Sequence, residues 1–65
     1  MRVRIEIERE DDGRWLADIP ALPGVMAYGA TRAEAVKKVK VLAFRVIADE
    51  IEHGDRSPEV CIVEF

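Results

Sequence analysis

The start of the chain alternates between charged and apolar side chains. Within residues 2–9, Val3, Ile5 and Ile7 lie on one side of an extended backbone and the charged residues lie on the other. A period of two is typical of a strand with one buried face. Residues 10–13 form a polar segment that ends in glycine and predicts a turn. Residues 14–19 then predict the return strand of a hairpin, with these side chains facing the core: Trp15, Ala17 and Ile19.

Two registers of this hairpin remain open. A type I turn with Gly13 in the left-handed conformation places Glu6 opposite Asp18. A shift of two residues places Arg4 opposite Asp18 instead, and the charges favour that pairing. Both registers keep the same side chains on the buried face, so the periodicity does not choose between them.

A proline-rich corner and a third strand follow the hairpin. Residues 20–24 read Pro-Ala-Leu-Pro-Gly, and Pro20 and Pro23 cannot donate a hydrogen bond to a strand ladder. The Pro-Gly pair at the end of this run suits a tight turn. Residues 25–28 predict a short third strand.

A capped helix is predicted next. Thr31 followed three residues later by Glu34 forms a capping box, which opens a helix that extends to about His53. Gly54 stands where helices commonly end, and Pro58 prevents the helix from resuming. Residues 60–65 alternate again and predict a last strand.

The apolar residues of this helix form more than one group. One broad stripe is expected to face the sheet, and a second set lies off its centre, which an isolated surface helix would not need. The stripe comprises Val36, Val39, Ala43, Val46 and Ile47, and the second set comprises Val41, Phe44, Ala48 and Ile51.

The predicted fold is α+β, with the order β-β-β-α-β, an antiparallel sheet and one helix packed on one of its faces. A single helix leaves the other face of the sheet uncovered. A contiguous apolar patch on such a face usually marks an interaction surface. We expect this face to bind a partner or a second copy through six residues: Leu16, Met26, Tyr28, Cys61, Val63 and Phe65.

Length and composition favour one small domain that associates with itself. The chain has 65 residues, 49% of them hydrophobic, and residues 1–65 are expected to form a single domain. A domain of this size is marginally stable unless disulfides, metals or oligomerisation support it. Cys61 is the only cysteine and His53 the only histidine, so neither a disulfide within the chain nor a histidine–cysteine zinc site is expected. We therefore expect a homo-oligomer, a dimer or a tetramer, without a cofactor.

Charge and targeting signals narrow the function classes further. The net charge of −3 argues against direct binding of nucleic acid, which requires a basic patch. The first residues lack the apolar core of a secretory leader, and no apolar run approaches the length of a membrane span. We expect a cytoplasmic protein. Asparagine and glutamine are both absent, which suits a thermophile.

No catalytic motif emerges from the sequence. Glu6, Glu8 and Asp18 fall on one strand face, where a metal-dependent nuclease would hold its two ions. Arg4 and Arg14 lie among these carboxylates, which favours surface ion pairs instead. The nuclease hypothesis therefore ranks last, and we expect a protein that is not an enzyme.

Residues 12–24 together with residues 29–35 resemble the signature of the HicB-like antitoxin family. That signature combines an acidic-Gly turn, an aromatic strand residue, a Pro-x-Leu-Pro-Gly corner and a Gly-x-Thr cap before Glu-Ala. The resemblance covers about residues 2–53, with Val25 and Ala30 where many relatives have cysteine and an acidic residue. The matching positions are Gly13, Trp15, Pro20, Leu22, Pro23, Gly24, Gly29, Thr31, Glu34 and Ala35.

This resemblance implies a fold and a function. The fold is similar to a truncated ribonuclease-H-like core without its nuclease site. The function is neutralisation of a small, basic HicA-like toxin that cuts messenger RNA. Many relatives add a C-terminal DNA-binding domain, which we do not expect here because the sequence stops at Phe65. The alternative is a solitary homo-oligomeric structural or ligand-binding domain without a toxin.

Overall fold

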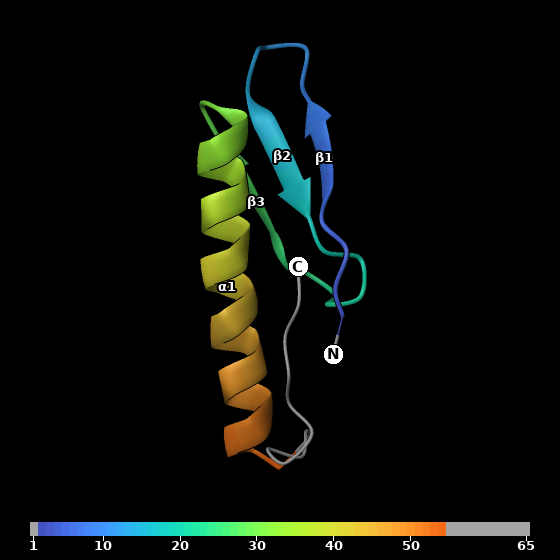
Figure 1. Cartoon of the computed structure of the whole chain (residues 1–65), viewed down its shortest axis with the longest axis vertical. Coiled ribbons are helices and arrows are strands. Elements are labelled where there is room, and N and C mark those ends of the chain that lie inside the picture. The colour runs from blue at the N-terminus through green and yellow to red at the C-terminus, as the bar shows by residue number, and fades with distance from the viewer. Residues whose placement is uncertain (1, 55–65) are drawn as a thin grey trace.

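Three antiparallel strands and one helix make up the fold of the computed structural model, which describes residues 2–54 (Figure 1). The strands are β1 (Glu6–Arg9), β2 (Trp15–Asp18) and β3 (Met26–Gly29), and they lie in the order β1-β2-β3. Helix α1 (Arg32–Glu52) packs on one face of the sheet, mainly over β3 and β2. This arrangement confirms the α+β class and the β-β-β-α order. The last predicted strand, residues 60–65, lies outside the described residues.

The β1–β2 hairpin adopts the register that the turn favours. Glu6 lies opposite Asp18, and Arg9 lies opposite Trp15. The amide of Gly13 donates to the carbonyl of Glu10 at 3.0 Å, and Gly13 has a φ of 90°. Turn geometry therefore outweighs the cross-strand charge pairing, which would have favoured the shifted register.

Strand β1 is shorter than the alternation of residues 2–9 predicts. The amide of Ile19 donates to the carbonyl of Val25 on the β3 side. Because successive residues of a strand point their amides in opposite directions, the next donor toward β1 would be Pro20, which has no N–H. The ladder consequently ends at Asp18. The alternation of buried and exposed side chains nevertheless continues on the N-terminal side of β1, as the buried Val3 shows.

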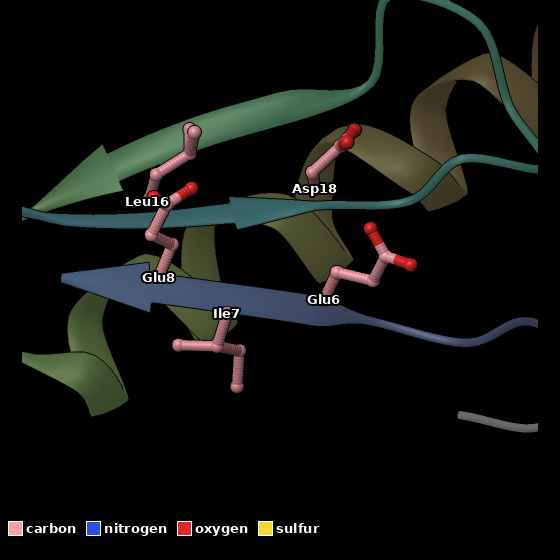
Figure 2. A pocket seen from close by; sticks show the side chains of 5 residues that line it. All are labelled: Glu6, Ile7, Glu8, Leu16 and Asp18. Atoms are coloured by element: carbon pink, nitrogen blue, oxygen red, sulfur yellow. The ribbon is translucent and has the colours of Figure 1, made fainter. Parts of the chain in front are cut away.

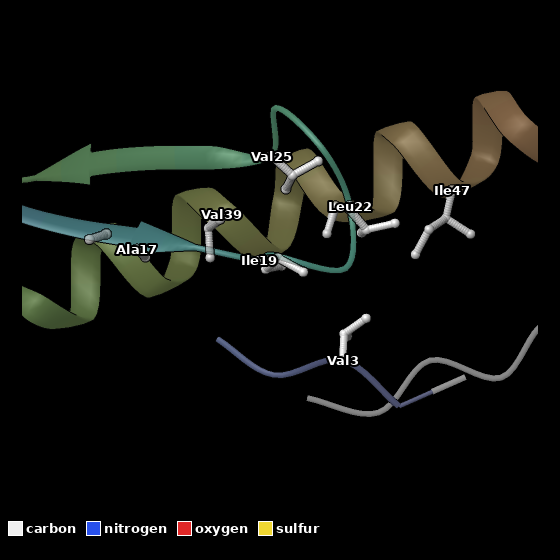
Figure 3. Packing of buried hydrophobic residues seen from close by; sticks show 9 residues of the cluster. Val3, Ala17, Ile19, Leu22, Val25, Val39 and Ile47 are labelled. Atoms are coloured by element: carbon white, nitrogen blue, oxygen red, sulfur yellow. The ribbon is translucent and has the colours of Figure 1, made fainter. Parts of the chain in front are cut away.

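The corner between β2 and β3 folds back into the core. Leu22 donates its amide to the carbonyl of Ile19, and Val25 donates to the carbonyl of Leu22, each at 3.0 Å. Gly24 takes a φ of 82°, which a glycine adopts without strain. Leu22 consequently points toward the helix and is buried beside Ile19 (Figure 3). The corner thus closes one end of the hydrophobic core.

Helix α1 begins at the predicted cap. The hydroxyl of Thr31 accepts a hydrogen bond from the amide of Glu34 at 3.1 Å, and Glu34 forms an ion pair with Lys38 at 2.9 Å. The helix ends at its C-cap, His53, and Gly54 follows with a φ of 80°. No helix in the described part of the chain is long and apolar enough to cross a membrane.

The buried line of α1 differs from the predicted stripe. Val36 and Val46 are only half-buried, whereas Ala35 is completely buried. Residues spaced by four form one row along a helix, so α1 is rotated about its axis toward Ala35 relative to the predicted stripe. The fully buried residues of α1 are Ala35, Val39, Ala43 and Ile47, and the half-buried Leu42, Val46 and Ile51 pack against the same core.

Candidate protein-interaction face

The face of the sheet that α1 does not cover is the first candidate site. Side chains alternate across each strand, so the residues facing away from the helix follow from the register. We call this surface the open sheet face. Its members in the described part of the chain are Glu6, Glu8, Leu16, Asp18, Met26 and Tyr28.

The open sheet face has an apolar side and an acidic side. Leu16 lies between Glu8 on β1 and Tyr28 on β3, and Asp18 lies between Glu6 and Met26. Met26 is 49% exposed and Tyr28 is 42% exposed. The apolar side therefore runs along β3 and the middle of β2, and the carboxylates lie toward β1.

A shallow hollow of about 290 Å³ lies on the acidic side. Glu6, Glu8, Leu16 and Asp18 project from the same side of the strands, whereas Ile7 points to the opposite side (Figure 2). Glu6 and Asp18 face each other on neighbouring strands. Such like-charged pairs destabilise a sheet. The arrangement suits a partner that brings positive charge to this spot.

Arginines beside the open sheet face engage neighbouring acidic groups. Arg4, which precedes β1, forms an ion pair with Glu6 at 2.9 Å. The side chain of Arg14 pairs with Asp12 at 2.7 Å, and its guanidinium lies 4.4 Å from the centre of the Tyr28 ring. The pKa of Asp12 is lowered, first by a hydrogen bond from the backbone amide of Arg14 and then by its side chain.

The three carboxylates of the nuclease hypothesis share this face. Glu6, Glu8 and Asp18 all project from it, as the strand pattern predicts. Within residues 2–54, however, no three acidic, histidine or cysteine side chains gather closely enough to hold a metal ion. Glu6 is engaged by Arg4 instead. Within the described part of the chain, these three carboxylates therefore form a charged surface and not a metal site.

The residues of the recognised motif occupy structural positions. Gly13 and Gly24 permit turns, Leu22 fills the core, and Thr31 with Glu34 starts α1. Pro20 and Pro23 flank Leu22 at exposed positions of the corner. Of the remaining motif positions, Trp15 and Gly29 lie on the side of the sheet that faces α1, and Ala35 belongs to α1 and lies against Gly29.

Trp15 is half-buried on this helix side. It packs against the core, and the guanidinium of Arg9 lies 5.9 Å from its ring centre. The structure thus separates Trp15 from the open sheet face. Leu16, Met26 and Tyr28 do come together there, whereas Cys61, Val63 and Phe65 lie outside the described residues.

A second exposed surface lies on α1. A groove of about 560 Å³ runs along the N-terminal half of the helix. Val41 is 45% exposed and Phe44 is 52% exposed. Both residues lie away from the predicted apolar stripe, and this position is the feature of the sequence that indicates a second apolar surface on the helix. The sequence assigned no role to that surface. The residues lining the groove are Arg32, Ala33, Val36, Lys37, Lys40, Val41 and Phe44.

One curated protein provides a distant comparison. The chain is similar to the UPF0150 protein Ta0767 of Thermoplasma acidophilum, with 29% identity over 58 residues. The match covers 89% of this chain and 84% of that protein, so it extends over nearly the whole of both. No protein-family model matches the chain, and no solved structure matches it.

Proposed function

We propose that this chain is a HicB-like binding module of the antitoxin type, which neutralises a HicA-like, mRNA-cleaving toxin by covering it. The observation that carries the proposal is the open sheet face, where exposed apolar residues adjoin three carboxylates. The motif of residues 12–35 supports the same family, and the similarity to a UPF0150 protein supports a small family of related domains. In this proposal the chain carries no catalytic activity of its own.

The mechanism of neutralisation is steric and electrostatic. A toxin that binds RNA presents a basic surface, because it must approach phosphates. Glu6, Glu8 and Asp18 complement that surface and accelerate the encounter. Met26 and Tyr28 lose water on docking and hold the complex together, as aromatic and methionine side chains do at the centre of interfaces. The bound domain then blocks the access of RNA to the toxin.

The test is coexpression with a HicA-like toxin from the same genome, scored by the growth of the host and by copurification. The wild-type chain is expected to restore growth and to bind the purified toxin. The double variant Glu8→Lys with Asp18→Lys reverses two charges of the open sheet face. It is expected to lose at least about tenfold in affinity, since charge reversal replaces attraction by repulsion.

The matched control is Asp11→Lys, because Asp11 is exposed in the turn of the hairpin and lies off the open sheet face. This variant is expected to retain nearly wild-type affinity. Equal losses of binding free energy per reversed charge in the control and the double variant would indicate a general effect of net charge and would contradict docking at this face. Failure of the wild-type chain to restore growth with any such toxin would contradict the antitoxin function itself.

A further inference from the structure

The outer side of α1 carries an exposed stripe that the packing against the sheet does not use. Successive members are separated by four, three, four and four residues, which keeps them on one side of a helix. Each is exposed, and Phe44 lies near the middle of the helix. We call this surface the helix stripe. Its members are Lys37, Val41, Phe44, Ala48 and Glu52.

The helix stripe has opposite charges at its two ends. Lys37 stands at the N-terminal end, Glu52 stands at the C-terminal end, and the three residues between them are apolar. The remaining charges of α1 follow the same gradient in their balance. The first half carries Arg32, Lys38 and Lys40 with one acidic residue, Glu34, and the second half carries Asp49 and Glu50 with one basic residue, Arg45.

We propose that a second copy of this chain docks on the helix stripe, with the two α1 helices antiparallel across a twofold axis beside Phe44. This axis places Phe44 against Phe44 of the second copy and Val41 level with its Ala48. It also places Lys37 level with Glu52 of the second copy, and the symmetry forms that ion pair twice. The basic half of each helix thereby faces the acidic half of the other.

Self-complementarity selects a second copy over another occupant. A closed twofold dimer requires one surface that supplies both members of each ion pair. The helix stripe supplies both, in an order that brings them together when the two helices are antiparallel. Helix α1 has 21 residues and is therefore about 30 Å long, which allows contact over several turns. A domain of this size also gains stability from association. The inference is independent of the proposed function, because it leaves the open sheet face available for a different protein.

The competing occupant is the open sheet face of another copy. That face also combines apolar residues with charge, and its carboxylates would meet Lys37 and the basic half of α1. Such a contact joins two different surfaces, so it generates rings or open chains instead of a closed dimer. The two arrangements predict different responses to paired charge reversal.

The test is a charge exchange followed by sedimentation equilibrium over a range of concentrations of the purified full chain. Wild-type chain is expected to form a dimer. Lys37→Glu and Glu52→Lys are each expected to raise the dimer dissociation constant by about tenfold or more, because each substitution places like charges together twice. The variant with both substitutions restores opposite charges across the axis and is expected to return to nearly the wild-type dissociation constant.

Two aromatic substitutions complete the test. Phe44→Ser removes the centre of the stripe and is expected to yield a monomer, whereas Tyr28→Ser on the open sheet face is expected to leave the dimer intact. Both residues are largely exposed, so circular dichroism should show a folded chain in each case. A wild-type monomer at millimolar concentration would overturn the proposal. Loss of the dimer in Tyr28→Ser, or no recovery in the charge-exchanged variant, would overturn it as well.

Discussion

At the scale of single residues, two glycines of the motif are required for different physical reasons. Gly24 has a φ of 82°, and no atom lies within 4 Å of where a Cβ would stand, so its requirement is conformational. Gly29 has no such backbone angle. A Cβ on Gly29 would lie 2.5 Å from the backbone nitrogen of Ala35, so its requirement is the close approach of α1 to β3. The sequence marked both positions but did not distinguish these reasons.

Substitution by alanine and by asparagine separates the two cases. Gly24→Ala should cost about 1–2 kcal/mol through left-handed strain, and Gly24→Asn should cost less because asparagine tolerates that conformation. Gly29→Ala should cost about 1–3 kcal/mol because α1 must move away from the sheet. Gly29→Asn should be worse still, since the larger side chain meets the same backbone. Urea unfolding of the four variants measures this ranking, and a milder effect of asparagine at both sites would contradict it.

At the scale of elements, the hairpin shows which local signals dominate. The turn at Gly13 determines the register, although it leaves Glu6 opposite Asp18. The charges that favoured the other register are engaged locally, because Arg4 pairs with Glu6 and Arg14 pairs with Asp12. Surface ion pairs contribute little to stability, so backbone geometry decides the pairing.

Asp18 should therefore be a position where stability can be gained. Asp18→Lys replaces a like-charged cross-strand pair by an opposite-charged one and should raise the free energy of unfolding by about 0.2–1 kcal/mol. In a double-mutant cycle with Glu6→Ala, most of this gain should disappear. A gain that is independent of Glu6 would show that the cross-strand pair is not its cause. The same variant should bind a basic partner less well, so stability and binding are expected to change in opposite directions.

The elements that the sequence predicts best are those with strong local signals. The cap at Thr31, the turn at Gly13 and the end of α1 before Gly54 all lie where local chemistry places them. The buried line of α1 was predicted less well, because Ala35 replaces Val36 in the core. Periodicity identifies an apolar side of a helix but does not give the rotation of the helix about its own axis, which decides which row of residues faces the sheet.

At the scale of the whole molecule, the two sides of the fold present different surfaces. The open sheet face carries carboxylates beside β3 apolar residues, and the helix stripe carries a charge gradient along α1. The sequence predicted an uncovered sheet face, because one helix cannot cover both faces. The sequence did not assign a role to the outer surface of the helix. Whether an additional apolar residue of a helix is exposed or buried depends on how the helix packs against the sheet, and the sequence pattern does not give that packing.

Acid should weaken the folded domain through two carboxylates with lowered pKa values. Arg14 lowers the pKa of Asp12 from 3.8, and Lys38 lowers the pKa of Glu34 from 4.5. Because these pKa values are lower in the folded state, the same carboxylates take up protons at a higher pH in the unfolded chain than in the folded chain. The stabilisation is thus complete above the ordinary pKa values and is lost as the pH falls through the folded ones.

Thermal unfolding between pH 7 and pH 2 measures this loss. The wild-type melting temperature should be constant at neutral pH and should fall below about pH 5.5, where unfolded glutamate begins to bind protons. Asp12→Asn and Glu34→Gln should lower the melting temperature at pH 7 and flatten its fall in acid, because each removes one group that binds a proton on unfolding. An acid slope that is equally steep in the Asp12 and Glu34 variants would place the responsible carboxylates elsewhere in the molecule.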